Sequence, residues 1–481
     1  MDTVRAVTGT PPPGRRIYAN RTLNLRGIKA IGYDLDYTLV HYRVEPWERR
    51  AYERLRAKLR EAGIPVDGLE FDHELVTRGL IVDLELGNLV KANRFGYVTR
   101  ASHGTRPLEF DLQRTTYGRT LAEPSDDRFV FLHTLFSISE ACMYAQLVDR
   151  LDAGELSRPI GYADLYRVVR RSLDEAHMEG ELKAEILAAP DAYVEPDPDL
   201  GQALLDQRNA GKRLLLITNS DWAYVPRILD HALAPTLGGV PWRELFELII
   251  VSARKPEFFQ RRQAAFALAS DDGLLRPCPT GIRQAGVYVG GDAAQVEAYL
   301  GVGGEDILYV GDHIYVDVHV SKAVLRWRTA LILRELEAEL AALDSFREQQ
   351  RQLETLMEEK VRLEFALSQA RLALQRHQHG DPAWADERTR SLREAITALR
   401  ARIVDLDDRV APLARESGEL GNRRWGPLMR AGNDKSHLAQ QVERFADIYT
   451  SRVSNFLYET PYGYLRAPRG TLPHDDAPLV E

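Results

Sequence analysis

The stretch IKAIGYDLDYTLV, residues 28–40, decides the fold of this chain. Its first part, from Ile28 to Tyr33, is a short, largely apolar run, and strands covered on both faces are hydrophobic throughout. Asp34 and Asp36 follow directly, so two carboxylates leave the end of this predicted strand two residues apart. Polar side chains at the carboxyl end of a buried strand are typical of α/β proteins that carry their chemistry at that edge of the sheet.

Three later segments have the same form of an apolar run that ends in polar residues. They are residues 213–217 before Thr218-Asn219-Ser220, residues 245–251 before Arg254-Lys255-Pro256, and residues 307–310 before Gly311-Asp312. Helical patterns lie between them, and the alternation of strand and helix predicts an α/β fold with a doubly wound, Rossmann-like parallel sheet. Because the carboxyl ends of parallel strands meet at one edge, the four polar clusters are predicted to form one site.

The residue types at this edge suit attack on a phosphate ester. One of the two carboxylates, Asp34 and Asp36, can attack while the other moves a proton, since a positioned carboxylate can serve as nucleophile or as general acid and base. The negative oxygens of a phosphoryl group also need cations and hydrogen-bond donors. Thr218, Ser220 and Lys255 can supply them.

A metal ion is predicted at the same edge. Asp312 and Asp317 offer the hard oxygen ligands that suit Mg²⁺, which would offset the repulsion between Asp34 and a phosphate dianion. Each cluster also has a plain structural interpretation, because Asp and Thr at strand ends often only cap a helix, Thr-Asn-Ser can be a turn and Lys255 can be solvated. The occurrence of all four clusters in one order, each at a strand end, favours the site.

The spacing of the clusters divides the chain into domains. About 180 residues separate Thr38 from Thr218, which is too long for a structureless loop. Residues 45–190 are therefore predicted to form an inserted cap or substrate domain. Residues 1–44 and 191–334 would form the catalytic core.

Residues 335–415 are predicted to form a long antiparallel helical hairpin. Apolar residues in alternating steps of four and three, typical of a coiled-coil seam, are Leu392, Ile396, Leu399, Ile403, Leu406, Val410 and Leu413. Residues 379–382 carry turn chemistry between the two arms. Because such a seam needs burial, we expect a homo-oligomer, and we expect residues 416–481 to pack on the core.

The composition excludes several classes of protein. The 481 residues are 44% hydrophobic and 28% charged, a balance that excludes wholesale disorder. The net charge of −8 argues against a nucleic-acid partner, and no apolar run reaches the length of a membrane span. With two cysteines, a disulfide framework is excluded, and a cytoplasmic location is expected.

The ordered motifs resemble those of the haloacid dehalogenase superfamily of phosphatases. The matching stretches are Asp34-Leu-Asp36-Tyr-Thr38, Thr218-Asn219-Ser220, Lys255-Pro256 and Gly311-Asp312-His-Ile-Tyr-Val-Asp317. The resemblance implies that Asp34 is the nucleophile and Asp36 the acid and base, and that Thr218 and Lys255 hold the phosphoryl group. It implies a Mg²⁺ site made by Asp34, the backbone carbonyl of Asp36, Asp312 and Asp317.

Longer blocks are similar to the cytosolic purine 5′-nucleotidase family, which includes the 5′-nucleotidase-domain-containing proteins. They include RGLIVDLELGNLVKANRFG, FLHTLFSISEA, LLLITNSDWAY, ILYVGDHIYVDV and LAQQVERFADIYTSRVSNFLY, and they extend from about Ile28 to Tyr464. The resemblance implies that a purine base lies between the core and the insertion. The matching positions are Phe136 for stacking, with Arg170, Asp174 and His177, while Asn219 and Ser220 would also bind substrate.

The spacing of the last three base-binding candidates fits this role. Arg170, Asp174 and His177 share one helical face, because residues three and four apart are neighbours on a helix. The plainer interpretation makes Arg170 and Asp174 a surface ion pair and Phe136 a core residue. Met178 follows His177 where the purine-preferring enzymes carry an aromatic residue.

The sequence therefore predicts a Mg²⁺-dependent 5′-nucleotidase that hydrolyses purine nucleoside monophosphates through an aspartyl-phosphate, with phosphotransfer to a nucleoside as a further activity. The alternatives are a phosphatase of another small phosphate ester and a scaffold protein that acts through its helical hairpin. The family's purine enzymes are also activated by nucleotides at a second site. Tyr315, Gln441 and Arg444 match part of that site, whereas Ala323 stands where those enzymes carry a lysine.

Overall fold

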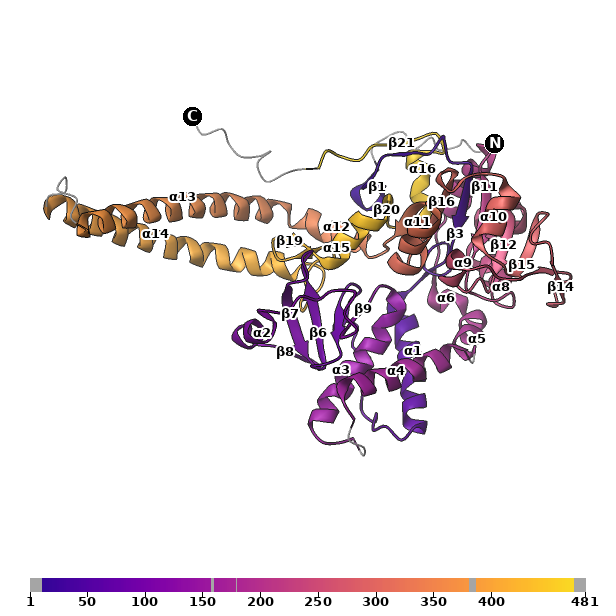
Figure 1. Cartoon of the computed structure of the whole chain (residues 1–481), viewed down its shortest axis with the longest axis horizontal. Helices are drawn as coiled ribbons and strands as arrows, with labels where there is room; N and C mark the ends of the chain where they lie inside the picture. Colours follow the sequence, from indigo (N-terminus) through magenta and orange to yellow (C-terminus); the bar gives the residue numbers. More distant parts are fainter. Residues whose placement is uncertain (1–10, 157–159, 179, 380–385, 471–481) are drawn as a thin grey trace. The chain divides into compact units, whose positions relative to one another are not determined.

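A ten-stranded sheet organises the larger part of the structure, a computed structural model that describes residues 11–156, 160–178, 180–379 and 386–470 (Figure 1). From β20 to β15 neighbouring strands pair in parallel, and β1, β13 and β14 add antiparallel strands at the two edges. The predicted α/β fold with a large parallel sheet is confirmed. The strand order is β1 (Tyr18–Ala19), β20 (Ile448–Thr450), β17 (Arg328–Ile332), β16 (Ile307–Gly311), β3 (Ala30–Tyr33), β11 (Arg213–Ile217), β12 (Phe246–Val251), β15 (Gly286–Gly290), β13 (Ala265–Leu268) and β14 (Leu275–Pro277).

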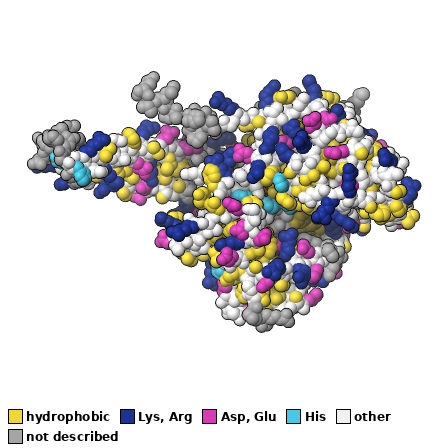
Figure 2. All heavy atoms as spheres, viewed as in Figure 1, with side chains coloured by type: hydrophobic (Ala, Val, Ile, Leu, Met, Phe, Trp, Pro, Cys, Tyr) yellow, Lys and Arg dark blue, Asp and Glu magenta, His cyan; other side chains and the backbone are white. Residues whose placement is uncertain are grey.

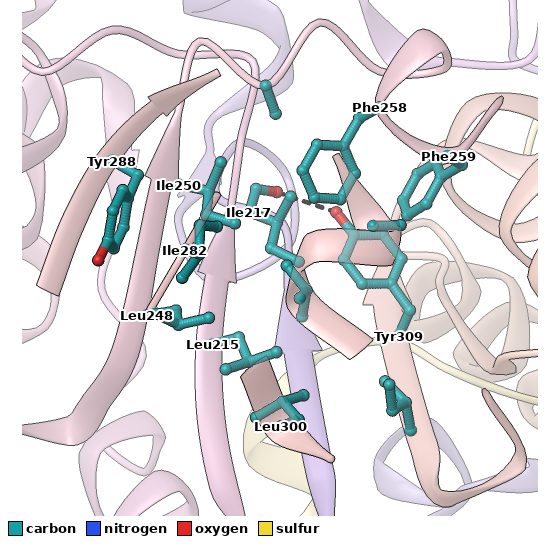
Figure 3. Packing of buried hydrophobic residues seen from close by; sticks show 14 of the residues in the cluster. Leu215, Ile217, Leu248, Ile250, Phe258, Phe259, Ile282, Tyr288, Leu300 and Tyr309 are labelled. Atoms are coloured by element: carbon teal, nitrogen blue, oxygen red, sulfur yellow. Dashed lines mark hydrogen bonds between the residues drawn. The ribbon is translucent and has the colours of Figure 1, made fainter. Parts of the chain in front are cut away.

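The central strands are buried because helices connect them. The connecting helices are α7 (Leu200–Asn209), α8 (Val225–Ala232), α9 (Glu257–Gln260), α10 (Ala293–Leu300) and α11 (Val320–Leu325), followed after the hairpin by α15 (His437–Phe445) and α16 (Phe456–Glu459). Figure 3 shows the packing of part of this core, in which Leu215, Ile217, Leu248 and Ile250 of β11 and β12 face Phe258, Phe259 and Tyr309. The Tyr309 hydroxyl donates a hydrogen bond to the Ile217 carbonyl (2.9 Å), so a polar group joins β16 to β11 inside the core.

The residues between β3 and β11 build a second sheet and a group of helices. The five-stranded antiparallel sheet has the order β8 (Arg106–Pro107), β7 (Val98–His103), β6 (Asn88–Ala92), β5 (Ile81–Asp83) and β9 (Phe129–Phe131). The helices are α1 (Val44–Glu61), α2 (Phe110–Tyr117), α3 (Ile138–Asp152), α4 (Tyr162–Met178), α5 (Glu181–Ala188) and α6 (Pro190–Tyr193). None of these described elements joins the large sheet.

The chain leaves for this region and returns from it at one place. β4 (His41–Tyr42) pairs antiparallel with β10 (Val194–Glu195). Contacts group residues 1–337 with 428–481 as one compact unit and residues 338–427 as another. The finer division into a core of residues 1–44 and 191–334 and a cap of residues 45–190 remains a prediction.

Several short elements complete the larger unit. β2 (Leu23–Asn24) pairs with β21 (Tyr464–Leu465), and β18 (Arg430–Ala431) pairs with β19 (Asp434–Lys435). Short helical turns are η1 (Pro13–Arg15), η2 (Leu135–Ser137), η3 (Ala234–Thr236), η4 (Trp242–Leu245), η5 (Gly304–Asp306) and η7 (Val453–Asn455), and η6 (Ile314–His319) is a π-helical turn. Two of them, η2 and η6, carry or adjoin predicted site residues.

The smaller unit is a pair of long helices. After α12 (Leu336–Ser345), α13 (Arg347–Gln378) and α14 (Asp386–Glu419) pack against each other. Leu356 and Leu363 of α13 and Leu406 and Val410 of α14 form the buried cluster between them. The expected helical arms are therefore present, whereas their winding as a coiled coil remains a prediction. The predicted turn at residues 379–382 falls mostly outside the described residues.

Among the described residues, no helix combines the length and the apolar character needed to cross a bilayer. On the face drawn in Figure 2, the basic and acidic side chains are interspersed rather than gathered by sign.

Candidate functional site

The polar clusters predicted from the sequence meet at the carboxyl edge of the large sheet. Each follows one of four neighbouring strands, in the spatial order β16, β3, β11 and β12. Contacts connect nearly all of the predicted catalytic and metal-binding residues, which are Asp34, Asp36, Thr218, Lys255, Asp312 and Asp317. The residues of the predicted site therefore lie together as a cluster of side chains, and their catalytic and metal-binding roles remain predictions.

Lys255 lies at the centre of this cluster. Its Nζ is 2.8 Å from Asp34 Oδ1 and 2.7 Å from Asp317 Oδ1, and it donates to the Tyr309 hydroxyl at 3.0 Å. The Leu35 backbone N–H also donates to Asp34 Oδ1 (2.8 Å). The Asp34 carboxylate is thus fixed through one oxygen, and no hydrogen bond from the described residues reaches Oδ2.

The loop that carries Lys255 is held by the loop after β11. The Lys255 N–H donates to Asn219 Oδ1 (2.7 Å), and Asn219 Nδ2 donates to the Lys255 carbonyl (3.2 Å). Ser252 and Arg254 in this loop have positive φ values of 47° and 59°, a conformation that costs energy for residues other than glycine. Asn219 therefore positions Lys255, and its predicted contact with substrate remains a prediction.

Three buried carboxylates converge beside Lys255. Asp34, Asp312 and Asp317 each place an oxygen within 4.8 Å of the others. Burial raises the pKa of Asp34 to about 7, against the opposing effect of Lys255. Burial likewise raises the pKa of Asp312 well above its usual range.

The charge balance of this group favours a bound cation. Burial alone would lower the pKa of Lys255, but Asp317 and Asp34 outweigh it and raise that pKa, so Lys255 carries one positive charge among three carboxylates. Carboxylate oxygens in a tight group are the ligands that Mg²⁺ takes in proteins. The residues present thus fit a divalent cation, with Asp34, Asp312 and Asp317 as the side chains that could hold it.

Asp36 lies in a separate hydrogen-bond network beside this group. Tyr42 donates its hydroxyl to Asp36 Oδ1 (2.5 Å), and Ser220 donates to Asp36 Oδ2 (2.6 Å). The Tyr42 and Tyr224 hydroxyls are 2.8 Å apart. Tyr42 was given no role in the sequence analysis, because a tyrosine eight residues after the first motif Asp carries no spacing signal of its own. In the structure it orients the predicted proton carrier.

The inserted region contributes a second cation that sequence reasoning missed. Lys183 of α5 donates through Nζ to Ser220 Oγ (2.9 Å) and lies over the ring of Tyr224, 4.7 Å from its centre. Lys183 belongs to none of the sequence motifs, so its place in the sequence did not indicate a contact with the site. A search for basic residues at the end of the insertion would have found it among several others.

Phe136, a predicted base-stacking residue, lies next to the first motif. Its ring is 4.8 Å from that of Tyr37 and 5.7 Å from that of Trp47. Two residues earlier, Thr134 reaches Asp312 Oδ2 at 3.5 Å. The half-buried Phe136 ring therefore packs on the aromatic cluster, in the same segment as the Thr134 side chain that contacts Asp312.

The other predicted base-binding residues lie on α4. Arg170 is 3.5 Å from the buried Glu140 carboxylate and 3.8 Å from Asp174. Its charge contributes to the lowered pKa of His313, behind the effects of burial, Arg78 and Lys255. His177 also belongs to α4, but its side chain lies outside the described residues. The structure thus shows the ion pair between Arg170 and Asp174, and base binding by either residue remains a prediction.

The sequence was then compared with known protein families. A model of the 5′ nucleotidase family matches residues 17–477, which is nearly the whole chain. The chain belongs to the 5′-nucleotidase family. This confirms the resemblance on which the motif assignment rested, and it places the protein among the phosphoric monoester hydrolases.

Curated relatives in this family are distant in sequence but match over most of their length. A 5′-nucleotidase domain-containing protein of Dictyostelium discoideum is 26% identical over 471 residues, covering 95% of this chain and 74% of the relative. The 5′-nucleotidase domain-containing protein 2 of Homo sapiens is 26% identical over 489 residues, covering 96% of this chain and 85% of the relative.

Solved structures also match parts of this 5′-nucleotidase-family chain. A haloacid dehalogenase-like hydrolase from Xanthomonas campestris is 14% identical, with a TM-score of 0.26, over 63% of this chain and 82% of its own. A β-phosphoglucomutase from a Pyrococcus strain is 10% identical, with a TM-score of 0.32, over 64% of this chain and 87% of its own.

A cavity of about 500 Å³ lies between the π-helical turn η6 and helix α15, both of which contribute residues to its lining. Tyr315, Gln441 and Arg444 line it, together with His133 and His437. The three residues that the resemblance linked to a second nucleotide site are thus brought together in this family member.

Proposed function

We propose that the chain hydrolyses nucleoside 5′-monophosphates with Mg²⁺, through a phosphorylated Asp34. The observation that carries this proposal is the pairing of two differently held carboxylates at one edge. Asp34 is fixed through one oxygen by Lys255, while Asp36 lies between two hydroxyl donors. One carboxylate is therefore oriented for attack, and the other is oriented to move a proton.

The reaction can be followed through the chain's own residues. Asp34 attacks the phosphorus, the bond to the ester oxygen breaks, and Asp36 gives that oxygen its proton. Asp36 then accepts a proton from water, which attacks the phosphorus and releases phosphate from Asp34. Lys255, Lys183 and the donors of residues 218–220 neutralise the phosphoryl oxygens, and a bound Mg²⁺ would add positive charge there.

Purine preference is part of the same proposal. The half-buried Phe136 ring, which packs on Tyr37 of the first motif, offers a stacking surface, and Arg170 and Asp174 offer a donor and an acceptor for polar groups on a base. A nucleoside hydroxyl can replace water as the acceptor of the phosphoryl group, since both attack the same intermediate. A phosphatase of another small ester remains the alternative if these side chains do not contact the substrate.

The test is phosphate release from IMP, GMP, AMP, UMP and p-nitrophenyl phosphate, with Mg²⁺ and with excess chelator. We expect purine-selective turnover that chelator and Asp34→Asn both abolish. Asp164→Asn, an exposed change on α4, is the matched control and should keep full activity. Turnover of p-nitrophenyl phosphate alone would refute the nucleotide part, and full activity in Asp34→Asn would refute the nucleophile.

We further propose that the chain self-associates, without a nucleic-acid or membrane partner. Exposed apolar residues at i, i+4 and i+8 on α13, which are Met357, Val361 and Phe365, support a protein contact on the hairpin. The same stripe supports the alternative of a scaffold role. Sedimentation velocity over a range of concentrations should show an oligomer, and a monomer at all concentrations would refute self-association.

A further inference from the structure

Arg78 is a fully buried arginine close to the carboxylate group. It lies in the turn before β5, and its side chain is 1% exposed. Its Nε donates to the His133 carbonyl (3.0 Å), and one terminal nitrogen donates to the backbone carbonyl of Asp312. The other terminal nitrogen is 3.6 Å from Glu335 Oε1.

The partners of Arg78 belong to the two segments that build the site. His133 directly precedes Thr134, which contacts Asp312 Oδ2, and Phe136 follows in the same segment. Asp312 itself supplies one of the three clustered carboxylates. A single guanidinium therefore ties the segment that carries Phe136 to the backbone of the Asp312 loop.

A buried guanidinium needs a physical reason, because a charge removed from water must be offset by hydrogen bonds or by an opposite charge. Arginine is suited to bridge two carbonyls because its five N–H groups have a fixed, planar geometry. Lysine could not reach both carbonyls from one rigid plane.

We propose that Arg78 is a positioning residue that fixes Asp312 for divalent-cation binding and links the Phe136 segment to the same point. This rests on the proposed function only in that Asp34, Asp312 and Asp317 hold the cation. Groups that orient metal ligands typically change metal affinity about 10- to 100-fold when they are removed. An effect of this kind is separable from a general loss of structure.

The test measures cation binding without substrate, by calorimetric titration of Mn²⁺ and Mg²⁺ into the full chain. We expect Arg78→Gln to raise the dissociation constant about tenfold or more, and Arg78→Lys to raise it less, because the lysine keeps the charge but loses one carbonyl. Arg452→Met is the matched control, since Arg452 is also largely buried and ion-paired, with Glu337. It should lower thermal stability and leave cation affinity unchanged.

Activity supplies a second readout that a merely structural role would not move. In Arg78→Gln the Mg²⁺ concentration for half-maximal rate should rise, and saturating Mg²⁺ should restore most of kcat. Folded Arg78→Gln and Arg78→Lys proteins that bind the cation as tightly as wild type would overturn the proposal. Asp312→Asn distinguishes failure of the cation site from failure of the Arg78 proposal. Unchanged cation binding in that variant would refute the cation site itself, whatever the effect of changing Arg78.

Discussion

Replacing Lys183 tests whether the inserted region takes part in phosphate binding. The change Lys183→Met keeps an aliphatic side chain of similar length and removes the ammonium, which contacts Ser220 Oγ at 2.9 Å and lies over the ring of Tyr224. Ser220 in turn donates to Asp36 Oδ2. A phosphate held near Ser220 would therefore lose one cationic donor, while the network around Asp36 would keep its hydroxyls.

The size of the effect follows from that geometry. A hydrogen bond to a charged group contributes about 1.5–3 kcal/mol, and each 1.36 kcal/mol is a factor of about ten in rate. We expect kcat/KM to fall roughly tenfold to a hundredfold, largely through KM, because the ammonium meets the phosphate dianion before and during attack. Lys183→Arg should restore much of the loss.

The assay is steady-state phosphate release with the best substrate of the panel. Lys29→Met is the matched control, since Lys29 precedes β3 at the end opposite the site and pairs with Asp306. It makes the same chemical change and should leave kcat/KM unaltered. Wild-type KM in Lys183→Met, or an equal loss in Lys29→Met, would refute the assignment of Lys183 to the phosphate.

Three further predictions concern the proton carrier, a buried carboxyl and the cavity between η6 and α15. With p-nitrophenyl phosphate, whose leaving group needs no proton from Asp36, Asp36→Asn should retain a phosphoryl group on Asp34, because water is no longer deprotonated, and intact-mass measurement should detect the adduct, which Asp34→Asn cannot form. Burial raises the pKa of Glu48 from 4.5 to about 8 in the folded protein. The contribution of the protonated Glu48 side chain to the stability of the fold is therefore complete below pH 4.5 and is lost as the pH rises through 8. By linkage that loss is about 5 kcal/mol, and the thermal midpoint of Glu48→Gln should therefore fall less than that of wild type between about pH 5 and pH 9. ATP should raise the rate at subsaturating substrate, and Arg444→Ala, which changes a residue that lines the cavity, should weaken that activation; an unchanged wild-type rate with ATP would contradict it.

The sequence predicted the location of the site because each chemical motif directly follows a predicted strand. Each polar cluster directly follows its apolar run, so strand pairing alone brings Asp34, Thr218, Lys255 and Asp312 to one edge. The spatial order β16, β3, β11 and β12 was not predicted, and the prediction of a shared site did not depend on it, because parallel strands joined by helices present the same end. The two predicted helical arms were similarly readable from the spacing of their apolar residues.

The residues that the sequence did not reveal act through tertiary contacts. Lys183 and Arg78 meet their partners across large separations in the chain. Tyr42 is near Asp36 in the sequence, but it belongs to none of the motifs. The place of Asn219 in a motif predicted a contact with substrate. In the structure its side-chain amide makes two hydrogen bonds to the backbone of Lys255. A motif names the residue types at a site, whereas the direction of each side chain depends on loops that pack from elsewhere.

The pairing of β4 with β10 joins the base of the inserted region to the chemistry. Tyr42 belongs to β4, and its hydroxyl holds Asp36. The short ladder therefore has two roles, because it closes the inserted region where the chain leaves and returns, and it places one of the two hydroxyls that hold the predicted proton carrier. A substitution that disturbs the ladder would change the surroundings of Asp36 as well as the fold of the inserted region.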